Sequence, residues 1–149
     1  MRAIVQRAHA ARVEVDGEVV GQVGRGLCAF VGAEAGDTEA DRRYIADKIA
    51  HLRIFPDEQD RMNRSLLDIG GEALLVSQFT LFGDVRRGRR PSFTGAMAPE
   101  EAREAFAKFV EAMKARGVPV ATGRFQATMR VVVDGDGPVT IMLDSRKLF

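Results

Sequence analysis

Residues 73–82 read Ala73-Leu74-Leu75-Val76-Ser77-Gln78-Phe79-Thr80-Leu81-Phe82, an apolar run without a charged side chain. A short apolar run that follows a turn signal is typical of a buried strand, and Gly70-Gly71 precedes this one. We therefore predict a covered strand here. Side chains alternate along a strand, which puts Ser77 and Phe79 on one face and Gln78 and Thr80 on the other.

Polar side chains interrupt this predicted strand at Ser77, Gln78 and Thr80. Buried polar groups need hydrogen-bond partners. These side chains either satisfy the local backbone or face a ligand, and the strand by itself leaves both readings open. The segment is therefore a candidate site.

Short strands and two helices are predicted around this segment. The first helix follows Thr38, where Thr38 and the acids after it resemble a capping signal. The second opens with Pro99-Glu100-Glu101 and ends before Gly117. The predicted strands are Arg2–Ala8 and Arg12–Asp16 with a hairpin at Asp16-Gly17, Gly26–Gly32, Arg53–Phe55, Val118–Ala121, Thr128–Val133 and, after a turn at Asp134–Gly137, Pro138–Asp144. This order predicts an α/β fold with a mostly antiparallel, partly rolled sheet and two packed helices.

The length of 149 residues corresponds to a single domain spanning residues 1–149. Hydrophobic residues make up 46% and charged residues 29%, as in soluble globular proteins. The longest uncharged stretch, Ala73–Gly83, is well short of the ~20 apolar residues that cross a bilayer. We expect no membrane association, no export signal and a cytoplasmic location. With Cys28 as the only cysteine, an intramolecular disulfide is impossible.

Metal and cofactor signatures are missing from the sequence. His9 and His51 belong to no metal-binding spacing, and the glycines at 21, 24 and 26 match no nucleotide-binding loop. We predict neither a metal nor a cofactor. His51 fits a helix C-terminus, where an imidazolium interacts favourably with the helix dipole. Cys28 fits a small core residue better than a reactive thiol.

Positive charge is concentrated in one predicted loop. The net charge is only +1, which excludes a globally basic nucleic-acid coat protein. The loop Gly83–Ala98, however, carries Arg86, Arg87, Arg89 and Arg90, with Asp84 as the nearby acid. Binding to a polyanion, if it occurs, is therefore local to this loop.

Taken together, these segments resemble the D-aminoacyl-tRNA deacylase family over essentially the whole chain. The likeness rests on Ser77-Gln78-Phe79-Thr80-Leu81 and Gly137-Pro138-Val139-Thr140. Supporting segments are Met1–Arg7, Met62-Asn63, Ser65–Asp68, Gly88–Phe93 and Thr122–Phe125. The chain departs from the family by Asp134-Gly135-Asp136 where Asn is frequent, and by Phe82-Gly83 where Tyr-Ala is frequent.

The resemblance implies a homodimeric, barrel-like α/β hydrolase that acts on tRNA charged with a D-amino acid or glycine. It implies that the ester to the 3′-terminal adenosine is cleaved as chiral proofreading in translation. It also implies that Gly137-Pro138 is cis and reaches into the partner's site. There the Gly137 carbonyl would exclude an L side chain, with Arg7 bracing the turn. From the residues alone, Gly137-Pro138 is typical of an ordinary turn, because only ~5–6% of X-Pro bonds in folded proteins are cis.

Catalysis is expected from main-chain groups around Phe79 and Thr80, helped by the substrate's ribose 2′-hydroxyl, as the family implies. An aminoacyl ester is already activated, so no catalytic histidine is needed. Phe125 and Met129 are candidates to hold the terminal adenine, with a core role equally open. The four arginines are candidates for contacts with tRNA phosphates.

Two other functions stay open from the sequence. One is a non-catalytic tRNA-binding module that uses the arginine loop and Phe125. The other is an amidohydrolase on small substrates with Thr80 as the nucleophile, although the adjacent sequence supplies no base to activate the hydroxyl.

Overall fold

The computed structural model describes residues 1–149 and contains eight strands, two α-helices and one 3₁₀ helix, η1. In chain order the elements are β1 (Arg2–Val15), β2 (Glu18–Val23), β3 (Gly26–Gly32), α1 (Glu39–His51), β4 (Phe55–Pro56), β5 (Met62–Arg64), β6 (Glu72–Ser77), η1 (Phe79–Phe82), α2 (Pro99–Ala115), β7 (Val120–Thr122) and β8 (Arg130–Asp144).

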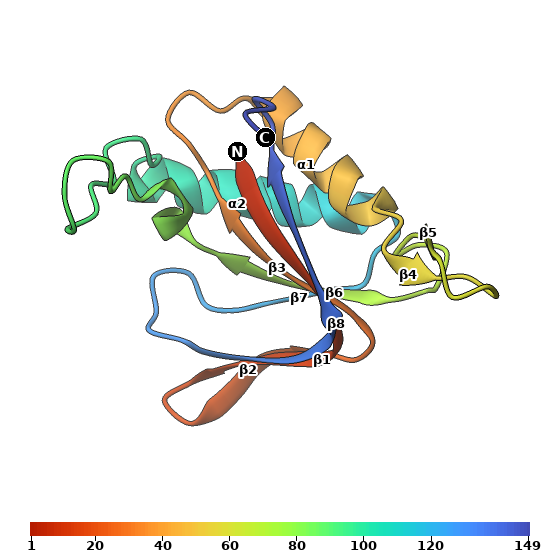
Figure 1. Ribbon diagram of the computed structural model, residues 1–149. Coiled ribbons are helices and arrows are strands. Elements are labelled where there is room, and N and C mark those ends of the chain that lie inside the picture. Colours follow the sequence, from red (N-terminus) through yellow and green to blue (C-terminus); the bar gives the residue numbers. More distant parts are fainter.

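Six strands form one rolled sheet (Figure 1). Its order is β2-β1-β3-β6-β7, and β8 also pairs with β1. β1 is antiparallel to β2, β3 and β8, whereas the pairs β3–β6 and β6–β7 are parallel. The two ends of the order approach each other, because Gly21 of β2 packs directly against the Thr122 carbonyl of β7. The predicted α/β fold with a mostly antiparallel, barrel-like sheet is confirmed.

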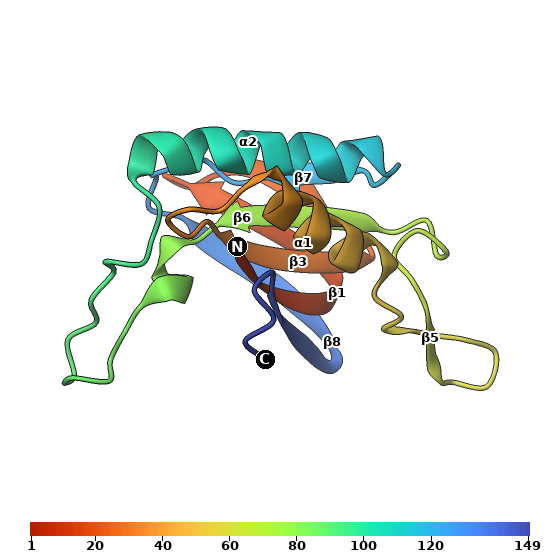
Figure 2. The same ribbon diagram turned by 90° about the horizontal axis from the view of Figure 1, so that it is seen from above.

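Both helices pack on the sheet and against each other (Figures 1 and 2). α1 begins where predicted, and the Thr38 N–H donates to Asp41 Oδ2 at 2.7 Å. α2 starts at the predicted Pro99, followed by Glu100 and Glu101 in its first turn. The main core lies between the helices and the sheet, and its largest fully buried side chains include Phe55, Phe109, Met1, Leu27, Ile45, Ile49, Leu66, Leu75 and Met113.

A second, smaller core fills the inside of the roll. It contains Ala11, Val13, Val15, Val23, Cys28, Leu74 and Val76. Burial raises the pKa of the Cys28 thiol to about 12, so the thiolate that would react is scarce at neutral pH. The interpretation of Cys28 as a core residue is confirmed.

The predicted strand over residues 73–82 is wrong in its second half. β6 ends at Ser77, and the Gln78 N–H still donates to the Val31 carbonyl of β3 at 2.9 Å. Residues Phe79–Phe82 then turn into a 3₁₀ helix, with the Gly83 N–H donating to the Thr80 carbonyl at 3.0 Å. The apolar composition continues through this turn, which is why the sequence conceals it. The expected alternation of faces therefore stops at Ser77.

The predicted turn between two strands at Asp134–Gly137 is also wrong. β8 runs through it as one strand, because Gly135 pairs with Ala8 and Thr140 with Gln6 of the same neighbour, β1. Residues 136–139 stand opposite Arg7 alone and form a large, irregular bulge. The chain bends outward here without reversing direction.

Two segments project from opposite ends of the molecule (Figures 1 and 2). One is the long loop between η1 and α2, and the other contains the β4–β5 hairpin, where β5 lies in a segment predicted as loop only. The two termini lie close together, and the Met1 ammonium donates to Ser145 Oγ at 2.8 Å. Neither helix has the length and apolarity that a membrane span requires.

Candidate active site

A cleft of about 390 Å³ opens beside the end of β6. Its walls come from η1, from the loop before α2, from the start of α2 and from the loop before β8. The lining residues are Met1, Val31, Ala33, Ser77, Phe79, Phe93, Ala96, Met97, Ala98, Pro99, Ala102, Phe106, Phe125, Gln126, Ala127 and Met129. None of their side chains is acidic or basic, so the cleft offers no titrating side chain to a ligand.

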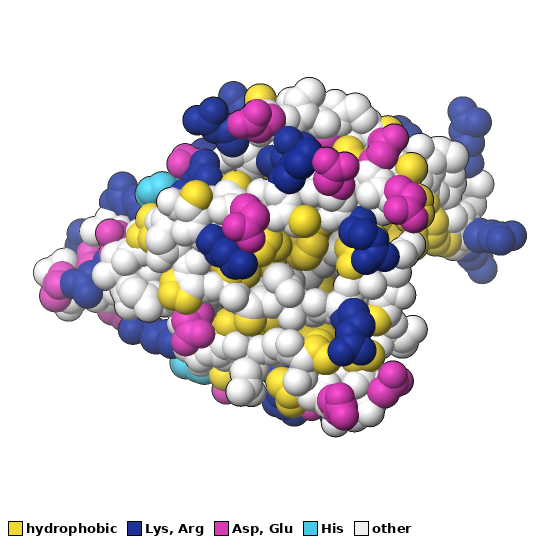
Figure 3. Space-filling view, turned by 180° about the vertical axis from the view of Figure 1, so that it is seen from behind, with side chains coloured by type: hydrophobic (Ala, Val, Ile, Leu, Met, Phe, Trp, Pro, Cys, Tyr) yellow, Lys and Arg dark blue, Asp and Glu magenta, His cyan; other side chains and the backbone are white.

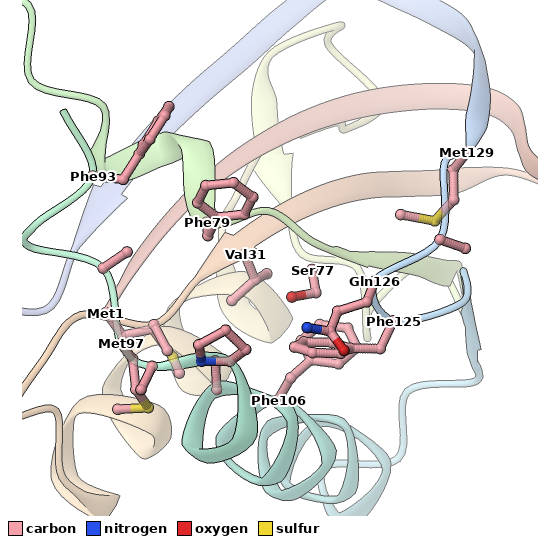
Figure 4. A pocket seen from close by; sticks show the side chains of 16 residues that line it. Met1, Val31, Ser77, Phe79, Phe93, Met97, Phe106, Phe125, Gln126 and Met129 are labelled. Atoms are coloured by element: carbon pink, nitrogen blue, oxygen red, sulfur yellow. The ribbon is translucent and has the colours of Figure 1, made fainter. Parts of the chain in front are cut away.

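Ser77 and Phe79 both line this cleft, although Ser77 ends β6 and Phe79 begins η1 (Figure 4). Ser77 is half-buried at the end of β6, whereas the Phe79 side chain is 55% exposed. The Phe79 ring meets the Phe93 ring edge to face, with centroids 5.0 Å apart. This aromatic pair forms one end of the cleft.

Phe125 and Met129 also line the cleft, opposite Phe79 (Figure 4). The Phe125 ring lies 6.5 Å from the Phe106 ring of α2, and the Arg103 guanidinium covers it at 4.7 Å. Arg103 also donates to the Gln126 side-chain carbonyl at 2.8 Å. Both predicted residues are half-buried and line the cleft, so this end of the cleft is largely apolar.

The side chains of Gln78 and Thr80 do not line the cleft. Instead, the Gln78 amide donates to the Thr80 hydroxyl at 2.9 Å on the exposed side of the turn. The main-chain N–H groups of Phe79 and Thr80 open η1, and the first N–H groups of a helix have no partner within it. In Phe79 and Thr80, the main-chain N–H groups are therefore the groups available to donate a hydrogen bond to a ligand.

Arg7 contacts the bulge that carries Gly137 and Pro138. Its Nε donates to the Asp136 carbonyl at 3.3 Å and its Nη1 to the Ile54 carbonyl at 2.6 Å. Gly137 has φ +127°, a value that L side chains rarely adopt, and the Gly137–Pro138 peptide bond is cis. Both residues are exposed and neither lines the cleft of their own chain.

Comparison with known proteins identifies the family. Residues 4–144 match the family described as D-Tyr-tRNA(Tyr) deacylase. The chain belongs to this family. Two of its relatives are named D-aminoacyl-tRNA deacylase. One, from Sorangium cellulosum (strain So ce56), is 59% identical over 150 residues, and the other, from Thermoanaerobacter sp. (strain X514), is 56% identical over 149 residues. Each alignment covers 100% of both chains.

Solved structures resemble this deacylase-family chain over nearly its full length. One is titled c-Myc DNA Unwinding Element Binding Protein, with a TM-score of 0.91, 38% identity, and coverage of 97% of this chain and 98% of that one. Another, titled as a probable eukaryotic D-amino acid tRNA deacylase, has a TM-score of 0.80 at 21% identity and covers 96% and 98% of the two chains. The latter likeness supports the fold alone.

The arginine loop of this family member is exposed, as predicted. Arg86, however, is already paired: its Nη2 lies 2.6 Å from Asp84 Oδ2 and its Nε donates to Asp84 Oδ1 at 2.9 Å. These hydrogen bonds lower the pKa of Asp84 to about 2. Arg87, Arg89 and Arg90 make no ion pair within the chain. Figure 3 shows Lys and Arg side chains extending from the edge where this loop projects in Figure 1.

Several cleft residues were not predicted from the sequence of this family member. Phe106 belongs to the apolar stripe of α2, and it lines the cleft together with Ala102. Gln126 and Met97 lie in loops without a motif of their own. The buried residues of α2 are Ala105, Phe109, Val110 and Met113. Apolar residues of this helix beyond these four were the one signal in the sequence for an apolar surface next to the core.

Proposed function

We propose that this protein hydrolyses the ester bond of D-aminoacyl-tRNA, and of tRNA mischarged with glycine, as chiral proofreading in the cytoplasm. Family membership over residues 4–144 supports the reaction class, as do the names of its full-length relatives. The observation that carries the proposal is the cleft itself. Phe125 and Met129 line one end, and the turn that follows Ser77 and carries Phe79 forms the other.

The end of the cleft lined by Phe125 and Met129 suits the terminal adenosine of tRNA. The volume of the whole cleft, about 390 Å³, is within the range of small-ligand sites, ~300–1,000 Å³. An adenine on Phe125 gains base–aromatic stacking, which contributes ~1–3 kcal/mol per base in other proteins. The Met129 thioether adds a soft contact to the same ring. The aminoacyl ester on the 3′-oxygen then extends toward Phe79.

The turn suits the reacting carbonyl. A water oxygen forms a bond to the ester carbon, and the carbonyl oxygen becomes an oxyanion that the N–H groups of Phe79 and Thr80 stabilise. The water gives up its proton, the bond from carbon to the ribose 3′-oxygen breaks, and that oxygen takes up a proton. The neighbouring 2′-hydroxyl lies where it can assist this transfer. No titrating side chain of the cleft takes part.

Two substitutions at one position separate the main chain from the side chain. Phe79→Pro removes the N–H, and Phe79 is the first residue of η1, where proline is tolerated. Phe79→Ala keeps the N–H and removes the ring. We expect the proline variant to lose about 10²–10³ in kcat, as for other lost oxyanion donors. Equal activity of the two variants would contradict a role for the main-chain group.

Chiral selection is proposed to involve a second copy of the chain. Gly137 and Pro138 are exposed and do not line the cleft of their own chain, which supports a role for them in the site of another subunit. Large apolar side chains also stand exposed without a cover in the single chain: Phe79, Met142, Leu148 and Phe149, each more than half exposed. A homodimer that inserts the Gly137 carbonyl beside the substrate's α-carbon excludes an L side chain sterically.

Mixed dimers test this arrangement. One parent carries Phe79→Pro and the other carries Gly137→Ala, and each homodimer lacks one half of every site. A mixed dimer has one composite site with both halves intact, and we expect it to recover D-specific turnover. Mixed dimers that form but hydrolyse D- and L-tyrosyl-tRNA with the poor selectivity of the Gly137→Ala parent would place the bulge with its own chain.

A non-catalytic tRNA-binding module is the alternative, favoured by the exposed arginines. The distinguishing measurement is release of free D-tyrosine from an excess of D-tyrosyl-tRNA. Release in many-fold excess over protein supports the enzyme. Retention of intact charged tRNA without release supports the binding module.

A further inference from the structure

Arg2 contacts the turn of Phe79 and Thr80 from outside the cleft. Its Nη1 donates to the Leu81 carbonyl at 2.9 Å, near the end of η1, and its guanidinium lies 4.8 Å from the centre of the Phe82 ring. The Nε of the same group donates to Asp144 Oδ2 of β8 at 3.0 Å. One planar cation therefore joins η1 to β8.

The ion pair of Arg2 and Asp144 is shielded from water. The Asp144 side chain is 1% exposed and that of Arg2 is 23% exposed. Asp144 also accepts the Arg146 N–H at 2.7 Å, so its carboxylate is fixed on both sides. A guanidinium held in this way has one orientation in which to present Nη1 to Leu81.

Gly32 of β3 determines how closely η1 lies on the sheet. A Cβ at this position would lie 2.8 Å from the Gln78 carbonyl oxygen and 2.9 Å from Cε2 of Phe82. The backbone of the turn thus rests directly on β3, and Arg2 holds its far end. Because the turn is packed this closely, a small shift of Arg2 displaces the turn as well.

We infer that Arg2, oriented by Asp144, is a positioning residue for the main-chain groups of Phe79 and Thr80. This inference rests on the proposed function. Arg2 does not line the cleft, so it touches no substrate and acts through the turn alone. Its loss should therefore impair the chemical step and leave substrate binding intact.

The test compares Arg2→Ala and Arg2→Lys with Arg146→Ala on D-tyrosyl-tRNA. Arg146 is a matched control, because it also bridges a carboxylate and a carbonyl, Glu34 at 3.2 Å and Ala35 at 3.0 Å, without contacting η1. We expect Arg2→Ala to lower kcat about 10²-fold, the scale of a misplacement near 1 Å. KM should stay unchanged, because only transition-state contacts are lost.

Arg2→Lys retains the charge beside Asp144 but lacks the fork that also reaches Leu81. We expect partial activity, again with an unchanged KM, and this variant decides the question if Arg2→Ala fails to fold. Wild-type kcat in Arg2→Lys, or a loss seen only in KM, would overturn the positioning role. An equal kcat loss in Arg146→Ala would do the same. If the wild type itself releases no D-tyrosine, the proposed function fails instead.

Discussion

The Arg7 guanidinium holds Asp136 at two points: Nε donates to its carbonyl at 3.3 Å and lies 3.1 Å from its carboxylate Oδ2. The Arg7 side chain is 12% exposed, so this contact is largely shielded from water. Its Nη2 stands 3.4 Å from where a Cβ on Gly137 would lie. Arg7 therefore fixes the start of the bulge and leaves Gly137 and Pro138 free to project.

Gly137→Ala should damage chiral selection more than the fold. At φ +127° an alanine is strained by about 1–3 kcal/mol, and its Cβ would lie 2.9 Å from Val139 Cγ2. Gly135→Ala is the matched control, because nothing lies within 4 Å of its Cβ. We expect a reduced ratio of D- to L-tyrosyl-tRNA hydrolysis only in Gly137→Ala. Identical ratios in the two variants would remove the bulge from the selection mechanism.

Thr80→Ala should retain substantial hydrolysis. The Thr80 hydroxyl contacts the Gln78 amide outside the cleft, and the substitution leaves the N–H in place. A covalent nucleophile would lose several orders of magnitude in kcat, as in other hydrolases. Single-turnover rates on D-tyrosyl-tRNA distinguish the two cases. A collapse of that size in a folded Thr80→Ala variant would make the threonine the nucleophile.

The arginine loop should contribute to tRNA affinity but not to chirality. Each phosphate neutralised adds roughly 0.7–0.9 to the slope of log affinity against log salt. Arg86 is paired with Asp84, so we expect Arg87→Ala and Arg89→Ala to flatten the slope more than Arg86→Ala. Arg61→Ala, in the segment at the opposite end, is the control. A slope that no loop variant changes would make the loop a solvated surface.

Asp41 should make stability depend on pH below about 4. Burial alone raises the pKa of Asp41, but hydrogen bonds from Ser145 and Thr38 outweigh it and lower the pKa from 3.8 to about 2. Because the folded pKa lies below the unfolded one, this stabilisation is present above pH 4 and disappears as pH falls toward 2. The difference in unfolding free energy between wild type and Asp41→Asn should shrink over that window. A constant difference would contradict the hydrogen-bonded carboxylate.

Much of the fold could be predicted because burial and helix capping leave local signals. Thr38 and Pro99 mark the helix starts, and the apolar run to Ser77 marks the strand beside the cleft. The 3₁₀ turn at Phe79–Phe82 could not be predicted, since its apolar side chains continue the pattern of the strand. Its geometry depends on contacts with Gly32 and Arg2, which are distant in the sequence.

The candidate site was predictable only in part for the same reason. Ser77, Phe79, Phe125 and Met129 meet in one cleft, but the apolar stripe of α2 does not by itself indicate that Phe106 joins them there. The Gly-Pro signal at Gly137 indicates a departure from regular pairing. It does not indicate whether the chain reverses, because that depends on which strand the flanking residues pair with, and both flanks pair with β1.

We propose that this chain hydrolyses D-aminoacyl-tRNA and rejects the L enantiomer. The most direct measurement is the rate of amino acid release from D-tyrosyl-, L-tyrosyl- and glycyl-tRNA under identical conditions. We predict rapid release of D-tyrosine and glycine and no release of L-tyrosine above the spontaneous rate. Equal rates for D- and L-tyrosyl-tRNA would contradict the claim.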